Sequence, residues 1–195
     1  NIVVLVDATK PVSVINEVNT ISNGGWAKNR DLSINITATD LNLNYWNITV
    51  YNDKGVASAT NQTSVNYTGL VNLTVSADGN FTVNLTTLDS ASNSNSTAFT
   101  INVDATTPVS AINYIHGNSS GGWINNRTLS INISGVDANI NNWNVSVYNA
   151  DGSNVATNQT SANYTGLVTL TLSADGNYTV NLTVTDLATN INLSS

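Results

Sequence analysis

Apolar and polar residues alternate along most of this 195-residue chain. Leu129, Ile131 and Ile133 alternate with Ser and Asn, and the stretches 143–147, 170–172 and 178–184 follow the same rule. A period of two is typical of β-strands that bury one face. Gly-Gly and Asp-Gly pairs mark turns between these stretches, and helical periodicity is not sustained anywhere. The pattern predicts an all-β fold of short antiparallel strands.

The chain repeats itself with a period of 97 residues and without gaps. Asp7-Ala8-Thr9 returns as residues 104–106, Gly24-Gly25-Trp26 as residues 121–123, and Ala77-Asp78-Gly79-Asn80 as residues 174–177. A repeat of this length that contains many short strands predicts one β-sandwich per repeat. We therefore expect a leading segment over residues 1–7, a first domain over 8–104 and a second domain over 105–195.

The end of the second repeat carries a recognisable pattern. The residues 174–180, Ala-Asp-Gly-Asn-Tyr-Thr-Val, are followed by Val184-Thr185-Asp186 and by Asn190. This pattern resembles the last strands of bacterial and archaeal Ig-like surface-protein repeats, in which a DG-x-Y-x-V strand leads into a TD-x-x-x-N turn. The resemblance implies two tandem immunoglobulin-like antiparallel β-sandwiches on the outside of a cell. The chain has no cysteine, so the disulfide of antibody domains is absent.

The two repeats end differently. The first finishes with the alternating stretch 99–104, whereas the second stops at Ser195, the equivalent of Ala98. The second sandwich is therefore expected to lack its last strand. The stretch 2–7 aligns with 99–104 but precedes the first repeat. We expect it to be a donor strand, made of Ile2, Val3, Val4, Leu5 and Val6, that completes the second sandwich of another copy.

Head-to-tail donation of this kind propagates into a filament, because the contact does not close on itself. The expected partners are therefore copies of the same chain in a homopolymer, with a surface or another cell as a further adhesive target. The arrangement resembles the donor-strand-complemented subunits of archaeal thread-like and pilus-like filaments. The alternative is a repeat pair within a long cell-surface adhesin or S-layer-associated stalk, in which the missing strand follows in the same polypeptide.

Charge excludes several other functions. Charged residues make up 9% of the chain, the net charge is −7 and only five residues are basic. Nucleic-acid binding needs clustered Lys and Arg, which are absent here. No apolar run approaches the 18–20 residues of a membrane span. The single histidine, His116, has no counterpart in the first repeat, which argues against acid–base catalysis. We therefore expect no enzymatic activity and no cofactor.

Sequons for N-linked glycans are abundant. Asn-x-Ser/Thr occurs 17 times among 35 asparagines, and such sequons are glycosylation acceptors in exported proteins. Asn is a poor strand former, so a strand surface rich in Asn and almost free of charge favours solvation by sugars. The alternative is a plain polar face. The expected acceptors are Asn35, Asn47, Asn61, Asn66, Asn72, Asn80, Asn84, Asn95, Asn118, Asn126, Asn132, Asn144, Asn158, Asn163, Asn177, Asn181 and Asn192.

Carboxylates are the remaining candidates for a ligand. Calcium prefers six to eight oxygens, and the aspartates that recur in both repeats supply some of them. The calcium candidates are Asp7, Asp89, Asp104 and Asp186, with Asp89 expected near Asp104 and Asp186 near the incoming Asp7. The alternative is that these aspartates stabilise turns.

The remaining distinctive residues have structural explanations. Trp46 and Trp143 are expected in the two cores, and Trp26 and Trp123 over the ends of the sandwiches. Arg30 and Arg127 are expected to pair with nearby carboxylates.

Overall fold

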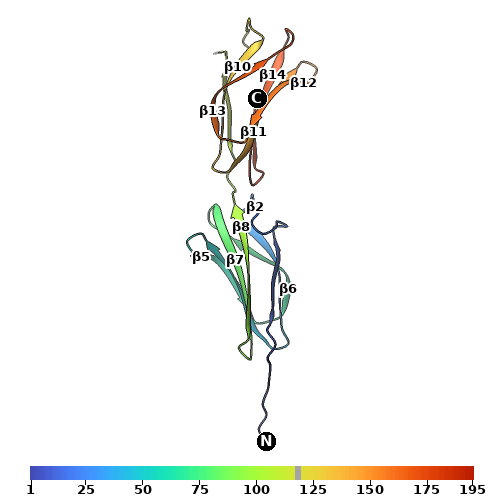
Figure 1. Ribbon diagram of the computed structural model, residues 1–195, viewed down its shortest axis with the longest axis vertical. Coiled ribbons are helices and arrows are strands. Elements are labelled where there is room, and N and C mark those ends of the chain that lie inside the picture. The colour runs from blue at the N-terminus through green and yellow to red at the C-terminus, as the bar shows by residue number, and fades with distance from the viewer. Residues whose placement is uncertain (117–119) are drawn as a thin grey trace. The chain divides into compact units, whose positions relative to one another are not determined.

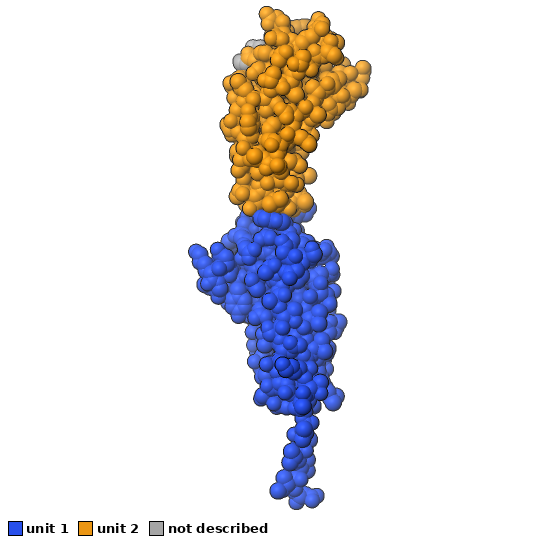
Figure 2. All heavy atoms as spheres, viewed as in Figure 1, with its two compact units in different colours: residues 1–105 blue, residues 106–195 orange. Residues whose placement is uncertain are grey.

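The computed structural model describes residues 1–116 and 120–195. Within these residues all regular structure is β-strand, and no helix is long and apolar enough to cross a membrane. The chain divides into two compact units, residues 1–105 and 106–195 (Figures 1 and 2). Each unit is described by itself below.

The first unit is a sandwich of two antiparallel sheets. One sheet has the strand order β1-β3-β6, and the other has the order β2-β8-β7-β4-β5, with β2 joined in parallel to β8. The bounds are β1 Val12–Val18, β2 Trp26–Ala27, β3 Asp31–Thr39, β4 Leu43–Asn52, β5 Ala57–Thr63, β6 Tyr67–Thr74, β7 Gly79–Asp89 and β8 Ser94–Val103.

The core lies between the two sheets and follows the alternation in the sequence. On β3 the buried residues are Leu32, Ile34, Ile36 and Ala38, and the polar residues between them face outward. Trp46, Ile48 and Val50 on β4 fill the opposite side of the same core. Because each strand with a period of two has one apolar face, the two sheets remove these faces from water by packing them against each other.

The strand order is that of an immunoglobulin-like sandwich. Sequential strands cross between the sheets, so that three strands pair in one sheet and β5, β4, β7 and β8 pair in the other. The prediction of an all-β, Ig-like fold is confirmed by this order. The core positions expected for Trp46 and Trp143 are confirmed as well, since both side chains are buried.

The second unit repeats the same plan with fewer residues in strands. One sheet has the order β13-β10-β9 and the other has the order β12-β11-β14-β15. The bounds are β9 Val109–Ile115, β10 Thr128–Val136, β11 Ile140–Asn149, β12 Asn154–Thr160, β13 Tyr164–Thr171, β14 Tyr178–Asp186 and β15 Ile191–Ser194. Leu129, Ile131 and Ile133 face Trp143, Val145 and Val147 across its core.

The last strand differs most between the units. β8 has ten residues and pairs with Gly79–Leu88 of β7, whereas β15 has four residues and pairs with Leu182–Thr185. In the described chain, the last strand of the second unit therefore covers β14 only over Leu182–Thr185.

The tryptophan that follows the Gly-Gly pair also differs between the units, because its surroundings depend on the length of the last strand. Trp26 begins β2 and pairs with Asn102 of β8. Its equivalent, Trp123, is in no strand and is 97% exposed. The expectation that Trp123 covers the end of the sandwich is wrong, since the part of β8 that borders Trp26 has no counterpart among the described residues of the second unit.

Candidate functional site

One edge of the second unit is open along half of β14. In the first unit, Phe81–Asn84 pair with Ala98–Ile101 of β8. The equivalent residues of β14, Tyr178–Asn181, pair with β11 on one side and with no strand of the described chain on the other. Main-chain groups at such an edge are available to a further strand.

The open edge also leaves the core of the second unit less covered. Val180 is 8% exposed, whereas its equivalent, Val83, is completely buried beneath β8. The amide oxygen of Asn181 is buried without a hydrogen-bond partner in the described part of the chain. A buried polar atom without a partner destabilises by about 1–3 kcal/mol. In the first unit the equivalent oxygen, of Asn84, accepts a hydrogen bond from Ser96, whose place on β15 is taken by Leu193. An added strand would therefore act here chiefly by burying apolar surface at Val180.

The expected donor residues lie free of any strand. Ile2, Val3, Val4, Leu5 and Val6 precede β1, and each is between 73% and 94% exposed. Five consecutive apolar residues in this state are unusual for a soluble surface. The segment is extended and separate from the sandwich in Figure 1.

Three aspartates meet at one end of the first unit. Asp7 follows the apolar segment, Asp40 follows β3 and Asp89 ends β7. One carboxylate oxygen from each lies within 4.8 Å of the others, and Asp89 is almost completely buried. Asp7 and Asp89 are calcium candidates from the sequence. Asp40, which recurs as Asp137 at the repeat spacing, was not among those candidates and joins them in the structure.

Asparagine side chains and turn amides hold these carboxylates. Asn93 donates its main-chain N–H to Asp89 Oδ1 over 2.8 Å and its side-chain amide to Asp89 Oδ2 over 2.7 Å. The same amide donates to the main-chain oxygen of Asp7 over 3.1 Å. Asn42 donates to Asp7 Oδ2 over 2.9 Å. This bond, followed by the bond from the N–H of Thr9, lowers the pKa of Asp7.

The second unit contains the same turn chemistry. Asn190 donates its N–H and its side-chain amide to the two carboxylate oxygens of Asp186, over 2.8 and 2.7 Å. The N–H of Asn139 donates to Asp137 Oδ1 over 2.7 Å. The alternative explanation of these aspartates as turn-stabilising residues therefore accounts for their hydrogen bonds.

The expected pairing of Asp89 with Asp104 is wrong. β7 and β8 are antiparallel, with Leu88 opposite Ser94 and Gly79 opposite Val103. Asp89 and Asp104 therefore lie at opposite ends of this strand pair. Calcium binding at the aspartates stays a prediction, because three carboxylates supply only part of the six to eight oxygens that calcium prefers. Melting with and without a chelator tests it.

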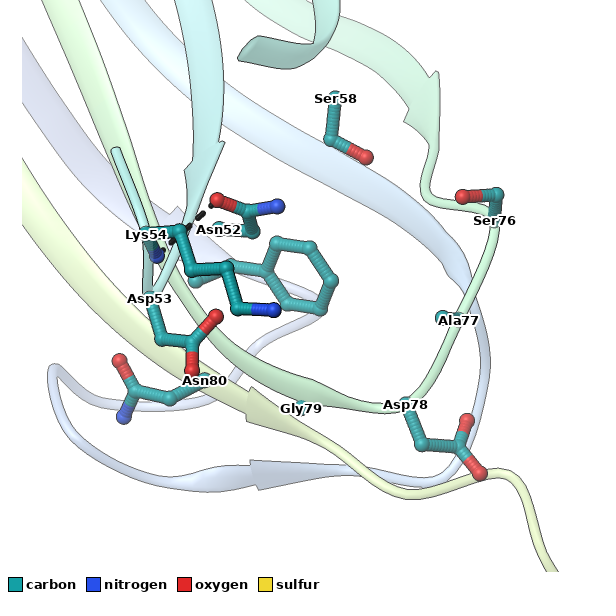
Figure 3. A pocket seen from close by; sticks show the side chains of 10 residues that line it. Asn52, Asp53, Lys54, Ser58, Ser76, Ala77, Asp78, Gly79 and Asn80 are labelled. Carbon is teal, nitrogen blue, oxygen red and sulfur yellow. Dashed lines mark hydrogen bonds between the residues drawn. The ribbon is translucent and has the colours of Figure 1, made fainter. Parts of the chain in front are cut away.

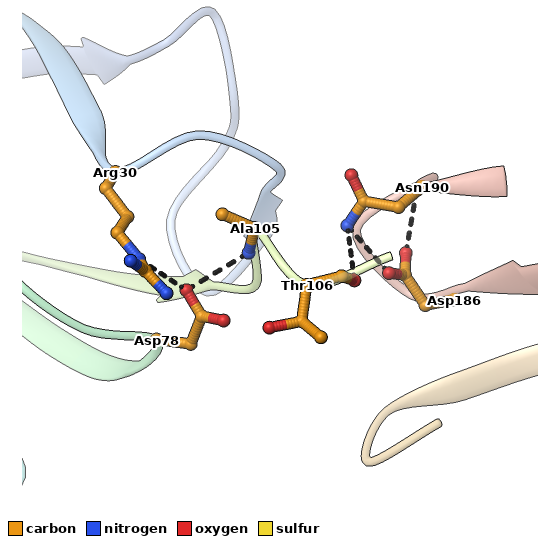
Figure 4. Close-up of polar contacts among 6 residues, drawn as sticks. All are labelled: Arg30, Asp78, Ala105, Thr106, Asp186 and Asn190. Carbon is orange, nitrogen blue, oxygen red and sulfur yellow. Dashed lines mark hydrogen bonds and ion pairs between the residues drawn. The ribbon is translucent and has the colours of Figure 1, made fainter. Parts of the chain in front are cut away.

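Arg30 and Arg127, which occupy equivalent positions in the two repeats, each form an ion pair with an aspartate. Arg30 Nε lies 2.9 Å from Asp78 Oδ1, and Arg127 Nε lies 2.8 Å from Asp175 Oδ1, as predicted. The Asp78 carboxylate also accepts the N–H of Ala105 over 3.1 Å (Figure 4). In the second unit, Figure 4 shows the bonds from Asn190 to Asp186 and to the main-chain oxygen of Thr106.

The sequons fall into two groups by exposure. The exposed acceptors are Asn61, Asn66, Asn72, Asn80, Asn95, Asn126, Asn158, Asn163 and Asn177. The half-buried acceptors are Asn35, Asn47, Asn84, Asn132, Asn144, Asn181 and Asn192. Asn118 lies outside the described residues. Sugar attachment at any of them stays a prediction.

One surface hollow in the described part of the chain is open, has a volume of about 520 Å³ and is lined by His116, Trp123, Ile124 and Asn125. The pocket in Figure 3 has a volume of about 180 Å³ and lies between the turn after β4 and the turn before β7. Ligand pockets usually measure about 300–1,000 Å³. Asp53, Lys54 and Asp78 are its charged residues, and neither a histidine nor a cysteine lines it.

These features define a pair of tandem Ig-like β-sandwiches with an open strand edge on the second. No family model and no curated protein matches the sequence. Among solved structures, the chain is similar to fibronectin(III)-like modules of CbhA from Clostridium thermocellum (TM-score 0.46, 12% identity, 91% of this chain and 90% of that one).

Two further solved structures are similar. One is a tetra-tandem repeat from the extending region of a large adhesion protein, with a TM-score of 0.41 and 23% identity; the match covers 94% of this chain and 47% of that one. The other is the FN1–FN3 part of chicken CNTN1, with a TM-score of 0.43 and 13% identity; the match covers 96% and 65%. The assignment of the fold rests on the strand order described above.

Proposed function

We propose that this chain is a structural, non-catalytic and glycosylated repeat pair of an extracellular surface filament, whose units associate by strand addition. The observation that carries the proposal is the open edge of β14 at Tyr178–Asn181. The abundance of sequons supports an extracellular, glycosylated location.

The first unit indicates what the open edge accepts. There the equivalent edge is covered by β8, and Phe99, Ile101 and Val103 of β8 are buried in the core. A strand with apolar residues at alternate positions would complete the second unit in the same way. Such strand addition obtains affinity from main-chain hydrogen bonds and register from alternate side chains.

The apolar segment near the amino terminus matches this requirement. In the register of the repeat, Ile2, Val4 and Val6 take the positions of Phe99, Ile101 and Val103. Burial of each is worth roughly 1.5–3 kcal/mol, so the three together contribute about 5–9 kcal/mol before main-chain bonds. Donation of this strand to β14 of another copy joins copies head to tail.

A continuous surface stalk is the second candidate function. In that arrangement the strand for β14 comes from the same polypeptide, and the ungapped 97-residue repeat is compatible with a longer array. Both functions are structural and use the same edge. They differ in the molecule that supplies the strand.

A binding experiment with a peptide tests the proposed donation. A labelled peptide of residues 1–8 is titrated with the full chain carrying Val4→Asp, which keeps its own donor segment from competing. We expect saturable binding and slower amide exchange at Tyr178–Asn181. The control peptide carries the same Val4→Asp change and should not bind, because a carboxylate would enter the core position of Ile101.

Light scattering of the unmodified and Val4→Asp chains, and the intact mass of native material, complete the test. Light scattering should show a mass that rises with concentration, and the Val4→Asp chain should remain monomeric. The intact mass of native material under denaturing conditions separates the two functions, since a stalk gives a much longer polypeptide. A peptide that fails to bind, together with a chain that stays monomeric, contradicts donation between copies.

A further inference from the structure

Each unit has one seam between its sheets that is closed by side chains. In the first unit, Asn95 on β8 donates to the main-chain oxygen of Pro11 over 3.0 Å, and Thr97 donates to that of Ser13. In the second unit, Asn192 and Ser194 on β15 donate to Pro108 and Ser110 over 2.9 and 2.7 Å. The edges β1 and β9 are therefore occupied by the neighbouring sheet.

Among residues 1–116 and 120–195, no side-chain bond of this kind closes the opposite seam. Within these residues β5, the outer strand of the first unit's larger sheet, pairs with β4 alone, and β12 pairs with β11 alone. Most residues of both strands are exposed. Their sequences, ASATNQT and NVATNQT, contain neither a charged residue nor a proline.

Proteins usually protect an edge strand from pairing with another molecule. Lysine, proline, a bulge or a covering segment serves this purpose. Segments of six or seven residues with low net charge, no proline and few glycines associate most readily when they also favour the strand conformation and lie exposed at an edge. Each strand has one bulge-like irregularity, between Ala57 and Ala59 in β5 and between Asn154 and Ala156 in β12, and the stretch from there to the sequon pairs regularly. With 9% charged residues in the whole chain, these regular stretches depend on some other protection.

Both strands carry a sequon at the same position. Asn61-Gln62-Thr63 ends β5 and Asn158-Gln159-Thr160 ends β12. Asn61 lies opposite Ile48, and Asn158 lies opposite Val145. Both asparagines are exposed, and neither side chain makes a hydrogen bond within the described part of the chain.

Neighbouring sequons do different work. The side chain of Asn66 accepts the N–H of Asp40 over 2.8 Å and donates to the oxygen of Asp40 over 2.9 Å. Asn163 does the same with Asp137, over 2.7 and 2.8 Å. These two amides hold turns in place, whereas the amides of Asn61 and Asn158 are available for attachment.

We infer that N-linked glycans on Asn61 and Asn158 cover the edge strands β5 and β12 and keep them from pairing with other molecules. The inference rests on the extracellular, glycosylated role proposed above and adds the sites and their purpose. Neighbouring strands lie about 4.8 Å apart, and a bulky hydrated sugar beside the edge excludes a second strand from that distance.

The attachment is a glycosyl transfer from an activated sugar phosphate, catalysed by a transferase of the cell. Nδ2 of the asparagine forms a bond to the anomeric carbon of the sugar, and the bond between that carbon and the phosphate oxygen breaks. The phosphate leaves with the electron pair and takes up the proton that Nδ2 loses. No atom is oxidised or reduced.

Peptide mass mapping of the native chain tests occupancy. We expect sugar on the peptides that contain Asn61 and Asn158. If other sequons carry sugar and these two do not, the inference is wrong while the proposed function stands. If no sequon carries sugar, the glycosylated role fails together with the inference.

Variants made in the same organism test the purpose. All carry Val4→Asp, so that strand donation does not contribute to association. Asn61→Gln with Asn158→Gln should increase the rate of association, measured by light scattering, several-fold. Asn61→Lys with Asn158→Lys also lacks both sugars, but lysine protects an edge strand, so this variant should associate as slowly as the parent.

A third variant controls for loss of sugar as such. Asn126→Gln removes one exposed sequon that precedes the central strand β10, and it should associate at the parent's rate. If the Gln variant at positions 61 and 158 associates no faster than the parent although both sites are occupied there, the inference is overturned. The same holds if the Lys variant associates as fast as the Gln variant.

Discussion

The indole nitrogen of Trp46 donates a hydrogen bond to the main-chain oxygen of Val65 over 3.1 Å. Trp143 occupies the same position in the second repeat, and its indole nitrogen is buried without a partner in the described part of the chain. Both rings contact a tyrosine, with centroids 5.5 and 5.4 Å apart. The two cores therefore share their packing but differ in one buried hydrogen bond.

This difference predicts unequal effects of the same substitution. Trp46→Phe removes a satisfied donor and leaves the oxygen of Val65 without it, whereas Trp143→Phe removes a donor that is already unsatisfied. We expect the first change to cost about 1 kcal/mol more than the second in free energy of unfolding. Denaturant unfolding of each variant, followed by the remaining tryptophans, measures it. Equal losses would contradict the assignment of the hydrogen bond.

A second prediction concerns Asn93, which holds Asp7 and Asp89 together. Asn93→Ala removes the side-chain bonds to both residues and leaves the buried carboxylate of Asp89 with fewer donors. We expect the first unit to lose about 1–3 kcal/mol of stability. Asn44→Ala, at an exposed position of β4, is the matched control and should change stability little. A loss no larger than that of the control would show that the cluster does not stabilise the fold.

The strands and the core could be predicted from the sequence, because both depend on the local alternation of apolar and polar residues. Leu32, Ile34 and Ile36 are buried as their period of two predicts, and the repeat transferred the same prediction to Leu129, Ile131 and Ile133. The arginine pairs were also predictable, since Arg30 and Asp78 recur together as Arg127 and Asp175.

The site could be predicted only in part, because it depends on which turns share an end of the sandwich. Asp40 joins Asp7 and Asp89 through a strand crossing that no spacing in the sequence reveals. The expected proximity of Asp104 to Asp89 is wrong because β7 and β8 run antiparallel, which puts the two residues at opposite ends of the strand pair. The exposure of Trp123 could not be predicted from local sequence either. Its equivalent, Trp26, pairs with Asn102 of β8, which lies far from it along the chain.

A third prediction follows from the ion pair between Arg127 and Asp175. The hydrogen bond from Arg127, and then its charge, lower the pKa of Asp175 in the folded chain. A carboxyl group with a lowered pKa stabilises the fold above its unfolded pKa, and this contribution is lost as the pH falls through the folded pKa. Because the pair is exposed, the contribution to stability is expected to be small.

Nuclear magnetic resonance titration measures that pKa directly. We expect the carboxyl of Asp175 to titrate below the ordinary range of aspartate, and to return to that range in Arg127→Gln. An Asp175 titration that does not change in the variant would mean that the ion pair does not persist in solution.

The open edge of β14 leads to the last prediction, which does not depend on the source of an added strand. In the monomeric Val4→Asp chain, amides of Tyr178–Asn181 that do not bond to β11 have no strand to protect them. The equivalent amides of Phe81–Asn84 are covered by β8. Exchange requires opening of a protecting bond, so unprotected amides exchange much faster.

We expect about half of the amides in 178–181 to exchange before any in 81–84, in hydrogen exchange read by nuclear magnetic resonance. Leu182–Thr185, which β15 covers, should remain protected and serve as the internal control. Equal protection across 178–185 would mean that the edge is already occupied in the isolated chain, and strand addition would then have no place to begin.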